Sequence, residues 1–168
     1  MKKKIAILGS TGSIGKTTLE ILKKNEKDFE IFLLSANNNY KKLKEQALKY
    51  KAKNVIIKNY KYYLKLKKEL NKKKIKVYNN FDILKKIPKK KIYYTMCAIS
   101  GLDGLGPTLD AIKFSKTIGI ANKESIICGW NLLKKNLIKY NTKFIPVDSE
   151  HYSIWNLTRE YSNNDIEE

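Results

Sequence analysis

A glycine-rich turn directly after an apolar run is the feature that most restricts how this chain can fold. Residues 5–8 (Ile-Ala-Ile-Leu) lead into Gly9, Gly12 and Gly15, after which the apolar residues follow a helical spacing. Glycines here permit a tight strand-to-helix turn and close approach of the backbone to a ligand. The helix N-terminus then offers unpaired N–H groups and a positive dipole end to an anion. The turn therefore predicts a phosphate-binding edge on a parallel α/β sheet.

Short apolar runs alternate with longer amphipathic segments along the rest of the chain. This pattern is typical of a Rossmann-like open parallel sheet with helices on both faces. The expected strands are residues 5–8, 30–34, 54–57, 76–78, 92–98, 117–121 and 143–147. The expected helices are residues 13–24, 40–50, 60–71, one that begins at Pro107, and 123–139.

The length and charge of the chain limit the other classes of function. With 168 residues it fits one ordinary domain with little left over. Its net charge of +19 would suit nucleic acid, but Arg159 is its single arginine. Because guanidinium groups dominate specific phosphate and base recognition, a solvated lysine face is favoured over the alternative, a lysine-rich nucleic-acid-binding module.

No apolar stretch reaches the ~18 residues of a membrane helix, and the run at residues 5–8 is too short for a signal peptide. We therefore expect no membrane association and a soluble, cytoplasmic protein. Cys97 and Cys128 lie in apolar runs without a nearby Cys or His partner. Both are predicted to be small buried hydrophobic residues rather than parts of a zinc site or disulfide.

The segment after the second expected strand indicates which dinucleotide would bind. Sites selective for NAD usually carry a carboxylate there, which holds the ribose 2′-hydroxyl. This chain instead has Asn37, Asn38 and Asn39, followed by Lys41 and Lys42. Because no carboxylate would repel a 2′-phosphate and two lysines follow, the sequence favours NADPH over NADH.

The glycine turn also permits a second interpretation. The segment from Ser10 to Thr17 approaches the phosphate-binding loop G-x-x-x-x-G-K-[ST], with Ser10 in place of the first glycine. Residues 144–148 would then supply an apolar strand that ends in a magnesium-binding aspartate, Asp148. From these segments alone, a nucleotide kinase or NTPase with such a loop remains an alternative.

Two carboxylates follow the last expected strand. On extended chain, Asp148 and Glu150 would leave on one side and converge, and such a pair suits Mg²⁺ or Mn²⁺. The other interpretation is an acidic helix start, in which Asp148 or Ser149 caps the helix and Glu150 faces its dipole. A similar pair of interpretations applies to Asn122, which either caps a helix or lines a cofactor crevice.

Three further segments, taken with the glycine turn, resemble the 1-deoxy-D-xylulose 5-phosphate reductoisomerase family. They are residues 106–112 (GPTLDAI), 121–125 (ANKES) and 146–151 (PVDSEH). The resemblance covers essentially the whole chain and is thin from 41 to 91. It implies an NADPH-dependent, Mg²⁺- or Mn²⁺-dependent oxidoreductase and isomerase that forms 2-C-methyl-D-erythritol 4-phosphate in non-mevalonate isoprenoid synthesis. It also implies a sugar-phosphate substrate and a homodimeric intact enzyme.

The resemblance assigns a role to particular residues. It implies NADPH contacts for Gly9, Ser10, Thr11, Gly12, Ser13, Ile14, Asn37, Asn38, Asn39, Asn122 and Glu124. It implies catalytic and substrate-binding roles for Lys123, Ser149 and Glu150, and metal ligation by Asp148 and Glu150. It gives His151 no ligand role, so this residue is expected to be structural.

The same resemblance divides the chain. Residues 1–147 are expected to form the NADPH-binding domain, and residues 148–168 to begin a catalytic domain that is incomplete here. The family continues with a third carboxylate ligand, further substrate-binding residues, a lid and a C-terminal helical domain, so we expect this polypeptide alone to have little or no activity. The family commonly has glycine and a basic residue where this chain has Asn37 and Asn38, while Asn39 matches.

Overall fold

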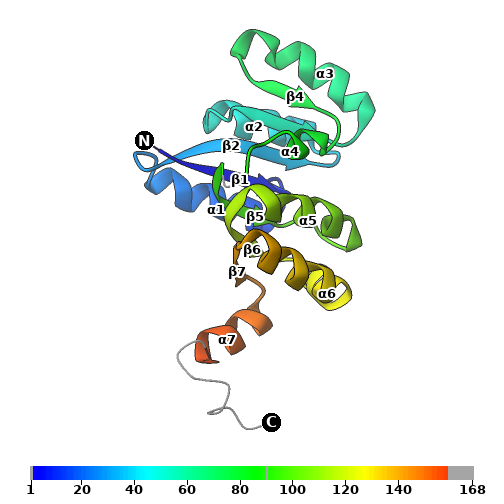
Figure 1. The fold of residues 1–168 in the computed structure, drawn as a ribbon. Coiled ribbons are helices and arrows are strands. Elements are labelled where there is room, and N and C mark those ends of the chain that lie inside the picture. The colour runs from blue at the N-terminus through cyan, green and yellow to red at the C-terminus, as the bar shows by residue number, and fades with distance from the viewer. Residues whose placement is uncertain (1, 90, 159–168) are drawn as a thin grey trace.

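The computed structural model describes residues 2–89 and 91–158, and seven parallel strands in them form one open sheet (Figure 1). The strands are β1 (Lys3–Leu8), β2 (Phe29–Ala36), β3 (Asn54–Ile57), β4 (Lys76–Tyr78), β5 (Ile92–Cys97), β6 (Ser115–Ile120) and β7 (Lys143–Pro146). Their order in the sheet is β4-β3-β2-β1-β5-β6-β7. The chain therefore builds outward from β1 in one direction up to β4, and then returns to the other side of β1 with β5. This reversal creates a topological switch point between β1 and β5.

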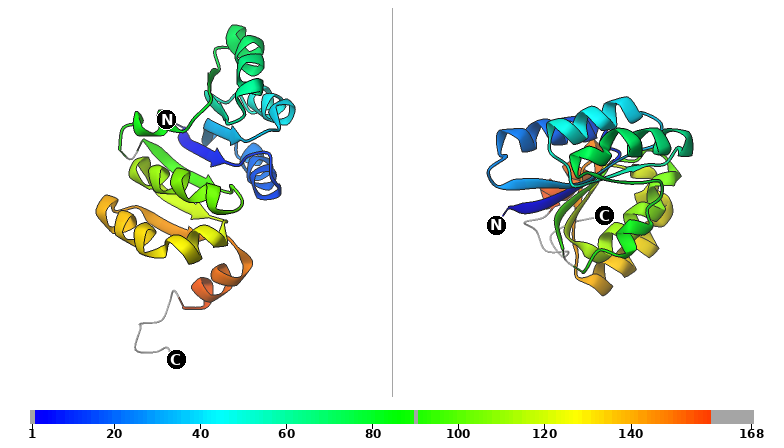
Figure 2. Two further views of the ribbon diagram at one scale, coloured as in Figure 1. Left: turned by 90° about the vertical axis from the view of Figure 1, so that its right-hand side faces the viewer. Right: turned by 90° about the horizontal axis from the view of Figure 1, so that it is seen from above.

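The sheet is buried on both faces, which explains why its strands are almost continuously apolar. Side chains alternate along β1, so Ile5 and Ile7 enter one apolar cluster while Ala6 and Leu8 enter the other. All four are at most 1% exposed. Each cluster is closed by a separate layer of helices, as the views in Figure 2 show.

Three helices cover the face that carries Ile5 and Ile7. They are α1 (Ser13–Lys24), α2 (Tyr40–Lys49) and α3 (Tyr60–Leu70), which insert residues such as Leu19, Leu43 and Leu66. The opposite face is covered by α4 (Asp82–Lys85), α5 (Leu105–Phe114) and α6 (Lys123–Tyr140). Two 3-10 turns, η1 (Asn71–Lys73) and η2 (Leu102–Gly104), precede β4 and α5. The Rossmann-like sheet with helices on both faces is thus confirmed.

A last helix, α7 (Ser149–Thr158), follows β7 and extends away from the sheet (Figure 1). None of its residues is buried, and Ile154 and Leu157 are 63% and 70% exposed. The prediction of extended chain at the start of this segment is wrong. The other interpretation, an acidic helix start with Asp148 as its cap, agrees with the structure.

The other differences from the predicted elements are small. The short helix α4 and the two 3-10 turns were not expected, and β6 begins two residues earlier than predicted because Ser115 already pairs with Ile92 of β5. Cys97 is buried as predicted, and burial raises its pKa to about 12. Cys128 is exposed on α6, which corrects its predicted burial.

Most of the described lysines between residues 41 and 91 are exposed on helix surfaces and at strand ends. Lys44 pairs with Glu69 at 2.7 Å, and Lys65 lies 5.0 Å from the ring centre of Tyr40. Within the described residues, no helix is both long and apolar enough to cross a membrane.

Candidate functional site

A cleft of about 480 Å³ opens at the carboxyl edge of the sheet. It is formed by the segments that follow β1, β5, β6 and β7, so it lies at the switch point where open α/β sheets bind ligands. Its lining includes Gly12, Ser13, Ile14, Asn122, Lys123, Glu124, Asp148, Ser149 and Glu150. Residues predicted from three distant motifs therefore meet in one cleft. Ala98, Ile99 and Ser100 also line the cleft, although they were not among the predicted site residues. Their position directly after a buried strand could have indicated it.

The three glycines of the first turn serve different purposes. Gly9 has φ +85°, and a Cβ there would lie 2.3 Å from the Ala98 carbonyl oxygen. A Cβ on Gly15 would lie 2.5 Å from the Gly9 oxygen, so this glycine lets the first turn of α1 pack on the loop. A Cβ on Gly12, which lines the cleft, would meet its nearest atom, the Gly9 oxygen, at an ordinary 3.5 Å. The protein's own packing thus requires Gly9 and Gly15, whereas it does not require a glycine at position 12.

The N-terminus of α1 faces the cleft without a capping side chain. Gly12 occupies the N-cap position, and the first turn contains no acidic residue. The first backbone N–H groups and the dipole are therefore available to an anion. Thr11 is half-buried and Ser13 is exposed, so both remain near this end of the helix.

Ser10, for which the resemblance implies an NADPH contact, uses its hydroxyl within the protein. The side chain is fully buried, and its hydroxyl donates to Gln46 Oε1 at 2.8 Å. Gln46 Nε2 donates back to the Ser10 carbonyl at 2.8 Å, and the Ser35 hydroxyl accepts from Gly9 N–H at 3.0 Å. Ser10 therefore fastens the turn to α2 and β2 from within. Sequence reasoning missed Gln46, because a single polar residue on an amphipathic helix carries no local signal.

Asn37, Asn38 and Asn39 are exposed at the carboxyl end of β2, beside β1. They lie outside the residues that line the cleft and extend the same edge of the sheet. Asn39 caps α2, because its side-chain oxygen accepts from Lys42 N–H at 3.2 Å. The Lys42 amine pairs with Glu45 at 3.1 Å. The first turn of α2 contains no acidic residue.

Asn122 shows the features of a helix cap. It is 3% exposed, and its side-chain oxygen accepts from Ser125 N–H at 2.9 Å at the start of α6. Its amide nitrogen donates to the Gly101 carbonyl at 2.6 Å and to the Ile99 carbonyl. Because both amide hydrogens are used, its side chain holds the loop after β5 in place, and it lines the cleft without a free donor.

Asp148 and Glu150 lie at a helix start and not on extended chain. Asp148 Oδ1 accepts from His151 N–H at 3.0 Å, which is the capping geometry, and also lies 2.6 Å from His151 Nδ1. Glu150 stands in the first turn of α7, where its carboxylate accepts from the Ser149 hydroxyl at 2.9 Å. The alternating geometry that we predicted for this pair is therefore wrong, although both residues line the cleft.

The surroundings of both acids favour their ionised forms. Burial raises the pKa of the Asp148 carboxyl, but the hydrogen bonds from the backbone and ring of His151, with the charge of that ring, outweigh burial and leave the pKa below its usual range. The pKa of Glu150 is lowered by its own backbone N–H, by Ser149 and by the nearby charge of Lys123. His151, which sequence reasoning left without a site role, thus orients Asp148.

Asp148, which lines the cleft, has one carboxylate oxygen that could accept a cation. Asp148 Oδ2 is buried and has no hydrogen-bond partner among the described residues. A buried carboxylate oxygen without a partner is costly, and a divalent cation would satisfy it. Glu150 offers a second carboxylate nearby on the same cleft wall. Within residues 2–89 and 91–158, no three His, Cys, Asp or Glu side chains group closely enough to hold a metal.

The geometry disagrees with the kinase or NTPase alternative. Helix α1 begins at Ser13, so Lys16 lies inside the helix and is not at the end of a phosphate-wrapping loop. The Thr17 hydroxyl donates to the Ser13 carbonyl of its own helix at 3.2 Å. Asp148 follows β7, which β5 and β6 separate from β1.

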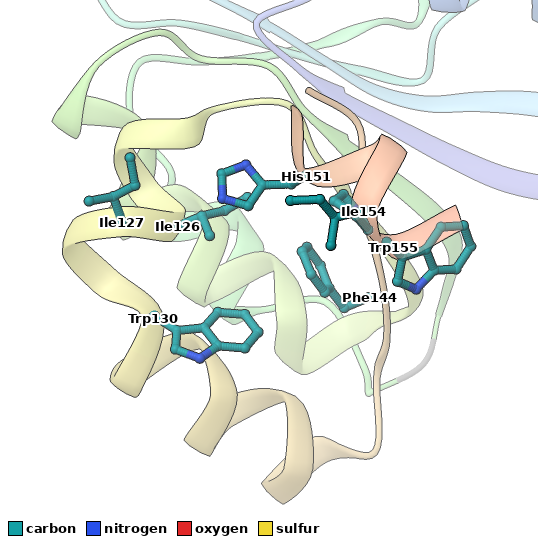
Figure 3. Close-up of a pocket in the computed structure, with 8 residues that line it drawn as sticks. Ile126, Ile127, Trp130, Phe144, His151, Ile154 and Trp155 are labelled. Atoms are coloured by element: carbon teal, nitrogen blue, oxygen red, sulfur yellow. The ribbon is translucent and has the colours of Figure 1, made fainter. Parts of the chain in front are cut away.

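A second hollow, of about 410 Å³, lies between α6, β7 and α7. Its walls are apolar apart from His151, with Ile126, Ile127 and Trp130 on α6 facing Ile154 and Trp155 on α7 (Figure 3). It lacks the glycine backbone and the polar groups that a dinucleotide phosphate needs. The cleft at the sheet edge is the better candidate for chemistry.

The fold and the cleft together define a Rossmann-like α/β domain with a cleft at the edge where such sheets bind their ligands. The family model for 1-deoxy-D-xylulose 5-phosphate reductoisomerase matches residues 5–129. The chain belongs to this family. It is 59% identical over 167 residues, or 98% of its length, to the 1-deoxy-D-xylulose 5-phosphate reductoisomerase of Pelagibacter ubique.

Solved structures agree with this assignment. The reductoisomerase of Zymomonas mobilis in complex with NADPH superposes with a TM-score of 0.82 at 35% identity over 89% of this chain. A DOX-P reductoisomerase in complex with NADPH, fosmidomycin and magnesium gives 0.84 at 29% identity over 92% of this chain. The chain spans 43% of the Pelagibacter relative and 40% and 38% of the two solved chains, so it corresponds to less than half of each.

Proposed function

We propose that this chain is the NADPH-binding part of a 1-deoxy-D-xylulose 5-phosphate reductoisomerase, which forms 2-C-methyl-D-erythritol 4-phosphate for isoprenoid synthesis. The observation that carries the proposal is the position of Gly12, which lines the cleft at an uncapped helix N-terminus although packing would tolerate a Cβ there. Such a position suits the close approach of a pyrophosphate.

We assign the pyrophosphate of NADPH to the backbone from Gly9 to Ile14. Thr11 and Ser13 add hydroxyl donors there, while Ser10 acts by holding the turn. Asn37, Asn38 and Asn39 receive the adenosine end, because they extend the same edge of the sheet beside β1. Asn122 and Glu124, at the start of α6, form the cleft wall toward the nicotinamide end.

The opposite wall is assigned to the metal and the sugar phosphate. Asp148 and Glu150 would hold Mg²⁺ or Mn²⁺, and the unpartnered Asp148 Oδ2 supports this role. Lys123, Ser149 and Glu150 would contact the substrate, since the ammonium of Lys123 can donate to hydroxyl groups and offset the phosphate charge. When bound, NADPH supplies a hydride, and the cation draws electron density from the substrate's oxygens.

We further propose that the NADPH-binding domain covers residues 1–147 and that residues 148–168 begin the catalytic domain. Supporting this boundary, α7 starts at Ser149 and buries none of its residues against the sheet. Residues 159–168 of this second unit lie outside the described residues. Homodimerisation and a cytoplasmic location remain predictions from the family resemblance, which sedimentation and cell fractionation would test.

A chimaera tests the proposed function directly. Residues 1–158 of this chain would replace the matching part of the Pelagibacter ubique relative, and NADPH oxidation would be followed with 1-deoxy-D-xylulose 5-phosphate and Mn²⁺. We expect turnover that Asp148→Asn abolishes. The 168-residue polypeptide alone should bind NADPH but show little or no turnover, because no three His, Cys, Asp or Glu side chains among its described residues group closely enough to hold a cation. An inactive but folded chimaera, or a polypeptide that fails to bind NADPH, would contradict the proposal.

A further inference from the structure

The turns that follow β2 and β3 are joined beyond the ends of the two strands. The hydrogen-bond ladder continues from Lys58 N–H to the Ala36 carbonyl and from Asn59 N–H to the Asn37 carbonyl, both at 3.1 Å. Asn59 then adds a side-chain contact, because its Nδ2 donates to Asn38 Oδ1 at 2.9 Å. Asn38 is exposed, so among the described residues this contact is what holds its side chain in place.

The contact decides which end of the Asn38 amide is presented to a ligand. Its oxygen is occupied by Asn59, so its amide nitrogen, with two N–H donors, is the end left to face outward. An exposed Asn without such a partner would present either end. Donors at this position suit an anion, whereas an acceptor would repel it.

Asn59 is itself held firmly. Its side-chain oxygen accepts from Lys61 N–H at 3.0 Å as the N-cap of α3, which fixes which end of its own amide points to Asn38. The charge around the pair also suits an anion. Neither α2 nor α3 has an acidic residue in its first turn, and no carboxylate of the described residues lies within 4.0 Å of the amines of Lys41 or Lys61.

We propose that Asn59 is a positioning residue for cofactor selectivity, which orients the Asn38 amide so that its N–H groups meet the 2′-phosphate of NADPH. This inference rests on the proposed NADPH site and adds a residue from the third strand's turn. Asn59 touches Asn38 rather than the cofactor, so its effect should appear in the preference for NADPH over NADH and not in dinucleotide binding as a whole.

The test measures NADPH and NADH affinities by isothermal titration calorimetry for the unmodified chain, Asn59→Ser, Asn38→Ala and the double variant. Serine is a good N-cap, so Asn59→Ser keeps α3 capped while it removes the donor to Asn38. We expect Asn38→Ala to weaken NADPH binding about tenfold and Asn59→Ser about threefold, with NADH affinity unchanged. The double variant should be no weaker than Asn38→Ala, because Asn59 acts only through Asn38.

The outcomes separate this inference from the proposed function. Equal loss of NADPH and NADH affinity in Asn59→Ser would mean a merely structural role and would overturn the inference, as would no loss at all. If the two substitutions lowered NADPH affinity independently, so that their fold losses multiplied in the double variant, the inference would also be overturned. If the unmodified chain binds neither dinucleotide, the proposed NADPH site is contradicted as well. If NADPH binds tightly and Asn59→Ser leaves its affinity unchanged, only the positioning role is contradicted.

Discussion

The turn after β1 and the segment after β7 form opposite walls of one cleft, yet they are held in very different ways. The glycine turn is enclosed by backbone: Gly9 contacts the segment after β5, and Gly15 packs on Gly9 itself. The segment after β7 enters α7, a helix with no buried residue. In the described chain, one wall is fixed by the core of the sheet and the other mainly by its own local hydrogen bonds.

The wall after β7 therefore depends more on its surroundings than the glycine wall does. The glycine turn after β1 is held in its conformation by packing within residues 2–89 and 91–158. Asp148 has a defined orientation through His151, but its second oxygen lacks a partner and α7 lacks cover. We therefore expect cofactor binding to be robust and metal binding to be weak in this polypeptide.

The largest effect should come from Gly9→Ala. A Cβ would lie 2.3 Å from the Ala98 carbonyl oxygen, and the φ of +85° disfavours every L-residue. We expect the free energy of unfolding to fall by about 3 kcal/mol or more. Urea denaturation measures this free energy. If Gly9→Ala were as stable as the unmodified chain, the glycine turn would be less rigid than its backbone contacts indicate.

Gly12→Ala should separate binding from stability. Its Cβ would have an ordinary 3.5 Å neighbour, so the loss of stability should be about 1 kcal/mol or less, mainly from the weaker N-cap. The same Cβ would stand where we place the pyrophosphate, and we expect NADPH affinity to fall at least about tenfold. Calorimetric titration beside the urea curve is the measurement. If Gly12→Ala bound NADPH as tightly as the unmodified chain, the pyrophosphate contact that we propose for this glycine would be contradicted.

Sequence reasoning succeeded where local sterics determine the structure. The strand-turn-helix at Gly9 to Gly15 and the buried strands follow from glycine conformation and apolar runs, which neighbouring residues cannot easily override. The motifs at residues 121–125 and 146–151 met in one cleft because parallel strands end at the same edge of a sheet.

The failures concern the directions of polar side chains. The resemblance implies an NADPH contact for Ser10, but its hydroxyl donates to the buried side chain of Gln46, 36 residues later. Asp148 and Glu150 looked extended, but His151 N–H completes a helix cap on Asp148. Such hydrogen bonds are tertiary or depend on where a helix begins, and neither can be read from residue spacing alone.

Asp148 allows its capping and metal roles to be separated. Asn is as good an N-cap as Asp, so Asp148→Asn should cost little stability, whereas Asp148→Ala should cost about 1 kcal/mol. Both variants lose the charge that would hold Mn²⁺, and we expect Mn²⁺ affinity to fall about tenfold in each. Electron paramagnetic resonance of free Mn²⁺ and thermal unfolding give the two readouts. If Asp148→Asn bound Mn²⁺ as tightly as the unmodified chain, this carboxylate would be excluded as a ligand.

The smallest expected effect is the dependence of stability on pH. The folded-state pKa of Asp148 is lowered, so its contribution to stability is fully present above the unfolded-state pKa, about 3.9, and is lost as the pH falls through the folded-state pKa. Below about pH 4, the unmodified chain should therefore lose stability more steeply than Asp148→Asn. Glu150→Gln is a matched control, because the pKa of Glu150 is also lowered while its carboxylate is exposed.

Added salt distinguishes the two acids in these acid-unfolding curves. Exposed charges are screened within about 3 Å at 1 M salt, so the difference between Glu150→Gln and the unmodified chain should shrink. The Asp148 side chain is only 9% exposed and bonded to His151 at 2.6 Å, so its difference should largely persist. If salt removed both differences equally, the Asp148–His151 contact would be no firmer than a surface ion pair. The wall after β7 would then depend on its surroundings even more than its hydrogen bonds indicate.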